Sequence, residues 1–312
     1  MKILVTGGAG FIGSQIVDEY LRLGHDVSIV DDLSTGRRSN INPRATFHHL
    51  DIREKEPVQE LFRRGKFDVV NHHAAQMDVR RSVADPVFDA SVNIVGVLNL
   101  LENCLGTGVR RFIFASSGGA ISGEQDYFPA DEEHPTRPIS PYGVAKLTTE
   151  KYLHYYREVQ QLESVCLRYA NVYGPRQNPE GEAGVVAIFT GKLLSGGQPV
   201  INGEGKQTRD YVYVGDVVRA NVLALDFKGS DIFNIGTGIE TDVNQVFHLL
   251  KKIIGSSAPE QHGPAKKGEQ MRSVLTSAKI ARVLGWKPAT SLEVGLGKTV
   301  EYFRNESTHA SS

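Results

Sequence analysis

The sequence holds only two cysteines, Cys104 and Cys166, which lie far apart in apolar stretches without metal-type spacing around them. We therefore expect two reduced thiols in the core, with neither a disulfide framework nor a bound metal ion. No apolar run approaches the length that crosses a membrane, and no signal peptide precedes the first expected strand. These absences predict a cytoplasmic protein without membrane partners.

An excess of charge is also missing, since 35 lysines and arginines face 36 aspartates and glutamates. A balanced chain has no general attraction for nucleic acid, so nucleic acid is not an expected partner. Any anionic ligand must instead be bound by local groups. Glycine, by contrast, is abundant at 32 of 312 residues, and several glycines stand where an expected strand gives way to a helix.

Short apolar runs alternate with longer segments of helical period in the first half of the chain. Strands are expected at 3–6, 26–30, 68–71, 111–115 and 164–168, and helices at 12–23, 86–105 and 142–160. Strands that alternate with helices favour a parallel sheet covered on both faces. The pattern predicts an α/β fold, a Rossmann-type doubly wound parallel sheet.

After about residue 170 this rhythm gives way to long connections rich in Gly and Pro, such as YGPRQNPEGEAG and SGGQPVINGEGKQTRD. Loops of this length favour a role in ligand binding. We therefore predict a Rossmann domain over 1–170 and a smaller substrate-binding domain over 171–312. A helix at 215–226 and a strand at 232–235 are expected to return to the first sheet, so that 211–236 belongs there and the second domain is interleaved.

The first strand ends in the stretch MKILVTGGAGFIG, which leads directly into the first helix. Glycines at this junction permit a tight turn, bring bare backbone close to a pyrophosphate and place it at a helix N-terminus. The stretch therefore predicts a dinucleotide site in the first domain. The predicted contacts are Gly7, Gly10, Phe11, Ile12 and Gly13.

Acidic residues end the second strand of this domain, at Asp31, and follow a further short strand that is expected just before Asp51. Asp31 stands where a carboxylate accepts hydrogen bonds from an adenosine ribose. Asp31 and Asp32 would repel a 2′-phosphate, which favours NAD over NADP, although Arg37 and Arg38 follow closely. Asp51 and Ile52 could flank the adenine; the alternative for Asp51 is a helix N-cap.

The stretch SPYGVAK places Tyr142 and Lys146 four residues apart at the start of a helix, and therefore on one face. A free phenol, with a pKa of about 10, is a poor base at neutral pH. An ammonium group about 5 Å away favours the phenolate by roughly 3 kcal/mol. The position of the pair after the glycine turn and the serine-rich strand end favours a base and its electrostatic partner.

The sequence resembles the extended short-chain dehydrogenases/reductases, and within them the NAD-dependent sugar-nucleotide epimerases, most closely the UDP-glucose 4-epimerase type. The resemblance covers nearly the whole chain and rests on seven ordered motifs: TGGAGFIG, DDLSTG, NHHAAQ, SSGGAISG, SPYGVAK, LRYANVYGPRQ and RDYVYVGDVVRA. It implies reversible inversion at C4 of a UDP-hexose through a 4-keto intermediate with tightly bound NAD. It also implies a homodimer built on helices 86–105 and 142–160.

The resemblance implies further site residues. Those beside the cofactor are His73, Ala74, Ala75, Gln76, Asn93, Tyr142, Lys146 and Tyr169. Those on the nucleotide-sugar side are Asn171, Val185, Val186, Gln198, Val200, Arg209, Lys266, Glu269 and Arg272. Lys266 stands where the family usually has arginine, and Arg272 could compensate for the difference. The small Ser273 makes an N-acetyl sugar conceivable.

The strand end SSGGAISG departs from the family pattern, because Gly118 aligns with the usual serine or threonine and Ser122 with the usual tyrosine. We predict that Ser117 bridges Tyr142 and the substrate oxygen; the alternatives are Ser116 and a water molecule. Dehydratases of the family carry an Asp–Glu pair just after this strand, where this chain has glycines and Ala120.

Other activities remain open at this point. They are decarboxylation, 4-epimerisation of a UDP-N-acetylhexosamine or UDP-uronic acid, oxidation that releases NADH, and a role as an NAD-binding regulator without catalysis. A regulator could keep the glycines without Tyr142 or Lys146, yet both residues are present.

Overall fold

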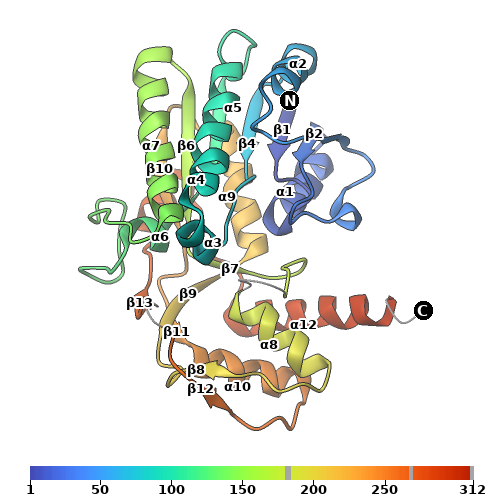
Figure 1. Cartoon of the computed structure of the whole chain (residues 1–312), viewed down its shortest axis with the longest axis vertical. Coiled ribbons are helices and arrows are strands. Elements are labelled where there is room, and N and C mark those ends of the chain that lie inside the picture. Colours follow the sequence, from blue (N-terminus) through green and yellow to red (C-terminus); the bar gives the residue numbers. More distant parts are fainter. Residues whose placement is uncertain (180–183, 267–269, 310–312) are drawn as a thin grey trace. The chain divides into compact units, whose positions relative to one another are not determined.

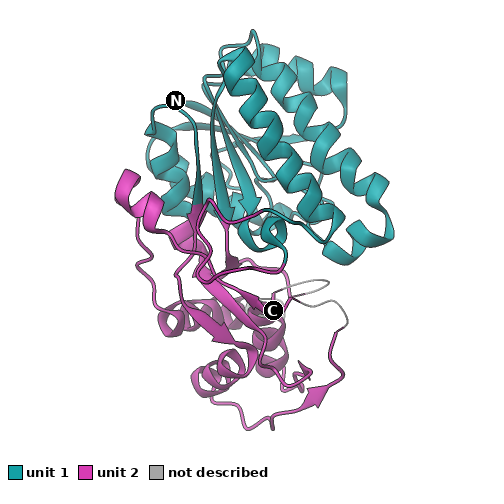
Figure 2. Ribbon diagram, turned by 90° about the vertical axis from the view of Figure 1, so that its left-hand side faces the viewer, with its two compact units in different colours: residues 1–123, 136–168, 218–233 teal, residues 124–135, 169–217, 234–312 magenta. Residues whose placement is uncertain are grey.

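The computed structural model describes residues 1–179, 184–266 and 270–309. The chain divides into two compact units (Figure 2), the first formed by 1–123, 136–168 and 218–233, and the second by 124–135, 169–217 and 234–312. Within the described residues, no helix is both long and apolar enough to span a membrane.

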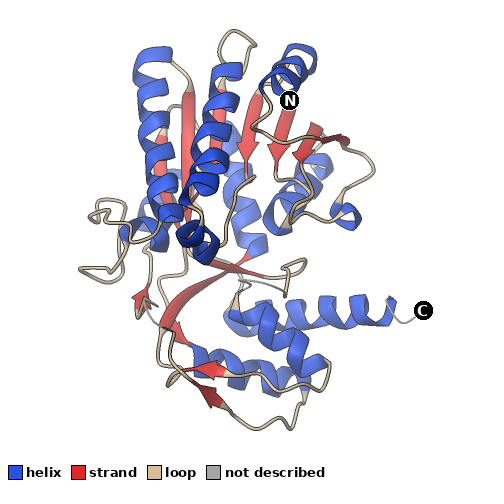
Figure 3. Cartoon of the chain, in the orientation of Figure 1, coloured by secondary structure: helices blue, strands red, loops and turns tan. Residues whose placement is uncertain are grey.

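A seven-stranded sheet forms the centre of the first unit (Figures 1 and 3). Its order is β10 (Asp231–Ile235), β6 (Glu163–Tyr169), β5 (Arg111–Ser117), β4 (Val69–His72), β1 (Lys2–Thr6), β2 (Asp26–Asp31) and β3 (Thr46–His49). β1 pairs in parallel with both β2 and β4. The strands that follow β1 are added first on one side of it, up to β3, and then on its other side, from β4. The strand order therefore reverses between β1 and β4, and such sheets bind ligands at this switch point.

Helices cover both faces of this sheet. They are α1 (Phe11–Arg22), α2 (Lys55–Gly65), α3 (Val79–Ala84), α4 (Pro86–Ala90), α5 (Gly96–Cys104), α6 (Gly118–Ser122), α7 (Pro141–Gln160) and α9 (Val214–Asp226), with a 3₁₀ turn η1 (Arg38–Asn40). One apolar core joins α2, α5 and α7 to the sheet. On the other face the Tyr20 hydroxyl of α1 donates to the Asn221 carbonyl of α9 at 3.2 Å. The predicted doubly wound fold is confirmed.

The expected helix at 86–105 is divided by a π-helical segment, η2 (Ser91–Val95), between α4 and α5. The backbone stays helical through the segment, but its hydrogen bonds reach one residue further. Asn93 lies in this wider turn. Cys104 and Cys166 are both buried and unbridged.

The second unit is built on short strands and helices. A four-stranded sheet joins β11 (Glu240–Asp242), β9 (Thr208–Tyr213) and β13 (Arg272–Ser273), with β7 (Asn171–Tyr173) also paired to β9. β8 (Ile201–Asn202) pairs with β12 (His262–Gly263). The helices of its described residues are α8 (Val185–Leu194), α10 (Val243–Ile254), α11 (Ala278–Leu284) and α12 (Leu292–His309).

The unit boundaries differ from the predicted domains at residues 124–135, which we expected in the first domain. They also differ at residues 211–217, which we expected to return to the first domain but which belong to the second unit with β9. Segment 124–135 hydrogen-bonds to residues near β13, since the Val274 N–H donates to Gln125 Oε1 at 3.0 Å and Ala130 forms a bridge with Leu275. Nothing in its composition indicates these partners, which lie far along the chain. β10, by contrast, joins the first sheet beside β6 as expected.

Candidate active site

The turn between β1 and α1 exposes backbone because side chains do not fit there. Gly7 has a φ of +70°, and a Cβ on it would lie 2.6 Å from the Ala74 nitrogen. A Cβ on Gly13 would lie 2.2 Å from the Gly7 oxygen. The N-cap residue Gly10 offers no side-chain cap, so the first N–H groups of α1, at Phe11, Ile12 and Gly13, are available to an anion. This turn fits the pyrophosphate of a dinucleotide.

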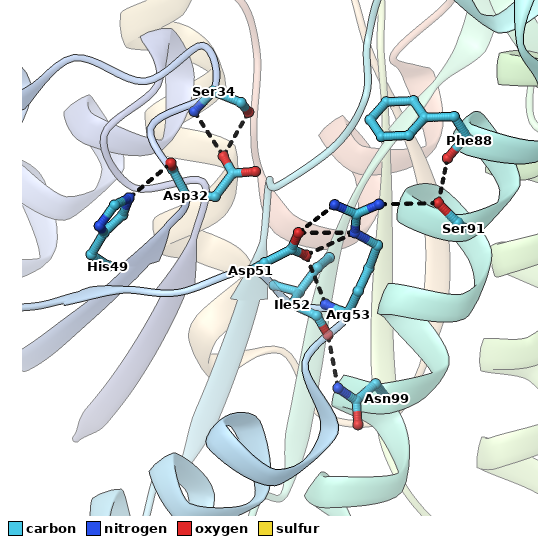
Figure 4. A network of polar contacts seen from close by, with 9 residues as sticks. All are labelled: Asp32, Ser34, His49, Asp51, Ile52, Arg53, Phe88, Ser91 and Asn99. Carbon is cyan, nitrogen blue, oxygen red and sulfur yellow. Dashed lines mark hydrogen bonds and ion pairs between the residues drawn. The ribbon is translucent and has the colours of Figure 1, made fainter.

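Asp31 ends β2 next to this turn. Its carboxylate accepts hydrogen bonds from the N–H groups of Ala9 and Leu33, both at 2.9 Å. Burial raises its pKa. Asp32 turns toward Ser34, whose Oγ lies 2.6 Å from Asp32 Oδ1 (Figure 4). Two of the four acceptor positions on the Asp31 carboxylate therefore stay open to ribose hydroxyls.

Asp51 follows β3 and is not an N-cap, because α2 begins at Lys55 with Glu54 as its N-cap residue. The Asp51 carboxylate instead pairs with Arg53, with 2.5 Å between Oδ2 and Nη2. Ile52 is buried beside it. The helix-cap alternative is therefore excluded.

A buried network fixes the segment 73–76 that follows β4. The Gln76 N–H donates to Asn93 Oδ1 at 2.9 Å, and Asn93 Nδ2 donates back to the Gln76 carbonyl at 2.8 Å. Asp89, 1% exposed, accepts from both side-chain amides at 2.9 Å. Asp89 is not among the predicted site residues, although its position four residues before Asn93 on one helix face could have indicated it.

Tyr142 and Lys146 lie in the first turns of α7. Ser140 caps this helix, since its Oγ accepts from the Gly143 N–H at 3.1 Å, and Pro141 is its first residue. Lys146 Nζ donates to the Ala115 carbonyl at 2.8 Å and lies 5.6 Å from the centroid of the Tyr142 ring. The pair is thus assembled on one helix face against the end of β5.

The electrostatics of this pair differ from the sequence argument. Burial raises the pKa of Tyr142, and the nearby Asp89 carboxylate raises it further. Burial lowers the pKa of Lys146 to about 8, against the opposing influence of Asp89 and Glu150. The expected lowering of the Tyr142 pKa is not seen, because burial and the Asp89 carboxylate both act to raise it.

The two serines at the end of β5 have different surroundings. The Ser116 hydroxyl is buried and donates to Glu150 Oε1 at 2.7 Å. The same carboxylate forms an ion pair with Arg168, with 2.7 Å between Glu150 Oε2 and Arg168 Nη2. Among the described residues, no side chain or backbone group hydrogen-bonds to the Ser117 hydroxyl, which is partly exposed. Of the two serines, Ser117 is therefore the one whose hydroxyl is available to bind a ligand.

The second unit contains a pocket of about 160 Å³. Four predicted substrate residues line it together: Asn171, Val185, Val186 and Arg209. Its lining does not include Gln198, Val200, Lys266 and Arg272, which were predicted for the nucleotide-sugar side, nor Ser117 and Tyr142, which were predicted to contact the sugar. Glu269 lies outside the described residues. Tyr169, predicted beside the cofactor, is buried at the end of β6.

Two of the residues outside this pocket already have partners. Arg272 donates two hydrogen bonds to the Glu240 carboxylate, from Nε to Oε2 at 3.0 Å and from Nη2 to Oε1 at 2.5 Å. Its guanidinium lies 3.7 Å from the centroid of the Phe128 ring. Gln198 Nε2 donates to the Pro259 carbonyl at 2.7 Å. A phosphate contact by Arg272 would therefore compete with Glu240.

Replacing Lys146 with methionine should stabilise the chain without added NAD at pH 7 by roughly 2–3 kcal/mol, because desolvation penalises the buried ammonium. Below pH 8 the lysine is protonated in both folded and unfolded chains, so the whole penalty applies. Between pH 8 and 10.5 the folded lysine loses its proton first and the penalty disappears. Urea unfolding at pH 7 and pH 10 measures this difference; equal gains at both pH values would contradict it.

Together, the glycine turn, Asp31 and the Tyr142–Lys146 pair define a dinucleotide-dependent enzyme of the short-chain dehydrogenase/reductase class. Residues 3–236 match the model of the "NAD dependent epimerase/dehydratase family". The chain belongs to that family, which confirms the predicted NAD cofactor and the predicted enzyme class.

Relatives of known name match over nearly their whole length. UDP-glucose 4-epimerase of Mycolicibacterium smegmatis is 43% identical, over 98% of this chain and 100% of its own. The crystal structure of UDP-glucose 4-epimerase from Thermotoga maritima with UDP-glucose is 50% identical, with a TM-score of 0.97 and coverage of 98% and 99%. The crystal structure of the Thermus thermophilus UDP-glucose 4-epimerase in complex with NAD is 44% identical, with a TM-score of 0.93 and coverage of 97% and 99%.

Proposed function

We propose that this protein interconverts UDP-glucose and UDP-galactose by inverting C4 of the hexose. The observation that carries the proposal is the pair formed by the half-buried Tyr142 and the buried Lys146 at the end of β5, in a chain that is 50% identical to a UDP-glucose 4-epimerase. NAD, when bound, supplies the acceptor and then the donor of one hydride. The Lys146 ammonium and the positive charge of bound NAD would favour the Tyr142 phenolate, which takes the proton of the 4-hydroxyl and returns it after the 4-keto sugar has rotated to present its other face.

The site residues keep their predicted roles in this proposal. Lys146 lowers the cost of charge on the Tyr142 oxygen, and Ser117 donates to the sugar oxygen. The predicted cofactor residues bind the dinucleotide, with Asp51 and Ile52 flanking the adenine. Asn171 and Arg209 bind the UDP diphosphate, for which arginine provides a matched pair of donors.

Incubation of the purified protein with UDP-galactose tests the proposal. We expect UDP-glucose of unchanged mass, approaching the same mixture from either sugar. A product that has lost water or carbon dioxide would identify a dehydratase or a decarboxylase, and accumulation of NADH would identify an oxidoreductase. Turnover only with UDP-N-acetylhexosamines or UDP-uronic acids would identify a 4-epimerase of those substrates instead. Binding of NAD without turnover would indicate a regulator.

Replacing Ser117 with alanine should lower turnover about tenfold to a hundredfold, because one hydrogen bond to the reacting oxygen is lost. Ser116→Ala should instead lower the unfolding free energy by about 1–3 kcal/mol, since Glu150 loses a buried donor, and leave turnover within about threefold. Initial rates and urea unfolding of both variants measure this. The opposite assignment, with Ser116→Ala inactive and Ser117→Ala active, would contradict the role of Ser117.

We also propose that two copies of the chain pair through α4, η2 and α7. Exposed apolar side chains lie along one side of α7, where Val144 stands about two turns before Tyr152, and Tyr155 and Val159 follow at intervals of about one turn. They are between 37% and 58% exposed. Val87 on the neighbouring α4 is 78% exposed. A patch of this kind is typical of a protein interface.

Light scattering after gel filtration should therefore give twice the mass of the chain. Val159→Glu, which places a charge among the exposed apolar side chains of α7, should shift the protein toward the mass of one chain. The matched control is Val294→Glu on α12, also exposed, which should leave the mass unchanged. A single-chain mass for the unaltered protein would refute the pairing.

A further inference from the structure

Asp89 is a buried carboxylate that has no cationic partner in contact with it. The residue is 1% exposed, and its Oδ1 atom accepts hydrogen bonds from Gln76 Nε2 and Asn93 Nδ2, both at 2.9 Å. Within the part of the chain that the structure describes, no lysine or arginine forms an ion pair with this carboxylate. Two neutral amides compensate a buried charge only in part. The negative charge of Asp89 is therefore left to act on groups that it does not touch.

Lys146 is a buried cation in a similar position. It is 5% exposed, and its Nζ donates to the neutral carbonyl of Ala115 at 2.8 Å. Burial lowers the pKa of Lys146, and the carboxylates of Asp89 and Glu150 oppose this effect. Glu150, however, already forms an ion pair with Arg168, with 2.7 Å between Oε2 and Nη2. Of these two carboxylates, Asp89 is therefore the one whose charge is not already compensated.

The helices that carry these two charges pack against each other. α4, which carries Asp89, contacts α7, and Asp89 lines the same pocket of about 430 Å³ as Ala145, the neighbour of Lys146 in α7. Thr149 Oγ1, about one turn after Lys146, donates to the Asn93 carbonyl at 3.2 Å. Because Asn93 also donates to Asp89, it joins the carboxylate to the helix of the catalytic pair. Packing therefore fixes the separation between the two charges.

Besides the two carboxylates, the described groups that titrate around Lys146 are His72, His73 and Tyr142. Burial lowers the pKa of both histidines and the Lys146 charge lowers it further, so both stay neutral near pH 7. Burial raises the pKa of Tyr142, and Asp89 raises it further. The charge of Asp89 therefore favours the protonated form of both members of the catalytic pair.

We infer that Asp89 is a positioning residue that acts through Lys146: it compensates the buried ammonium from α4 and thereby sets the pH range in which the Tyr142–Lys146 pair works. The inference rests on the proposed function, in which Tyr142 acts as a phenolate beside the Lys146 ammonium. Without the Asp89 charge, both groups would lose their protons at lower pH. The working range would then move toward acid as a whole, whereas a purely structural change would lower activity without moving the range.

Asp89→Asn separates the charge from the hydrogen bonds, because asparagine keeps an Oδ1 acceptor for the Gln76 and Asn93 amides. Lysine side chains labelled with ¹³C are titrated by NMR in the unaltered protein and in the variant, and the Lys146 signal is identified by its absence in Lys146→Met. We expect the titration of Lys146 to move to lower pH by roughly one unit in Asp89→Asn. An unmoved titration would overturn the inference.

The pH dependence of kcat/KM with UDP-galactose is the second measurement. Both limbs of the profile should move to lower pH in Asp89→Asn, the acid limb with Tyr142 and the alkaline limb with Lys146. The matched control is Glu158→Gln, which removes an exposed carboxylate from α7 and should leave the titration and the profile unchanged. Absence of turnover in the unaltered protein would contradict the proposed function, and the lysine titration would still decide the inference.

Urea unfolding tests the same coupling without turnover and without NMR. The gain in stability from Lys146→Met should be larger in the Asp89→Asn protein than in the unaltered protein, because the lysine has then lost its compensation. The extreme form of this result is an Asp89→Asn protein that does not fold and a double variant that does. Equal gains in the two backgrounds, or a double variant that also fails to fold, would overturn the inference.

Discussion

Replacing Tyr142 with phenylalanine should lower turnover by at least about a thousandfold, or roughly 4 kcal/mol of transition-state free energy. Tyr142 is the phenol beside Lys146 on this face of α7, whereas the other phenol on the face, Tyr156, lies fourteen residues further along and hydrogen-bonds to Glu102. Ser117 remains, but a serine hydroxyl does not take up the proton of the substrate at neutral pH. Initial rates with UDP-galactose measure the loss.

The structure also indicates that Tyr142→Phe will fold. No group among the described residues hydrogen-bonds to the Tyr142 hydroxyl, so its removal leaves no described partner unsatisfied. The matched control is Tyr155→Phe on the same helix, where the ring is 48% exposed and turnover should stay within about twofold. A Tyr142→Phe protein that retains a tenth of the activity would remove Tyr142 as the base.

The sequence predicted the catalytic pair and the glycine turn because both depend on local chemistry. Glycines between a strand and a helix have few other uses, and a spacing of four residues fixes Tyr142 and Lys146 on one helix face whatever surrounds them. The predicted strand 164–168 and helix 142–160 match β6 and α7 to within one residue at each end. Local rules suffice for these features.

Properties that depend on distant residues were not predictable. The raised pKa of Tyr142 comes from burial and from Asp89 on another helix, so its sign follows from packing and not from the Tyr–Lys spacing. The different surroundings of Ser116 and Ser117 depend on the Glu150–Arg168 ion pair, which joins α7 to β6. Each of these contacts joins segments that lie far apart in the sequence.

Replacing Gly13 with alanine should abolish the retention of NAD, with affinity lowered by at least about a hundredfold, and with it turnover. The added Cβ would lie 2.2 Å from the Gly7 oxygen and 2.9 Å from the Gly7 carbon. Both are backbone atoms, so the turn itself must move. The backbone at Gly7 is not free to move, because its N–H donates to the Val30 carbonyl at 2.8 Å and the Ala74 backbone packs closely against it.

The same substitution should also lower the free energy of unfolding by about 1–3 kcal/mol, which is the usual cost of forcing an atom into a packed interior. Gly297→Ala in α12 is the matched control, since a Cβ there meets nothing within 4 Å and alanine favours a helix by about 0.5–1 kcal/mol. Dinucleotide retained after gel filtration and urea unfolding measure the two effects separately. Full retention of NAD by Gly13→Ala would show that the pyrophosphate does not bind at this turn. The clash must displace the turn, and a displaced turn would no longer present the same backbone N–H groups to an anion.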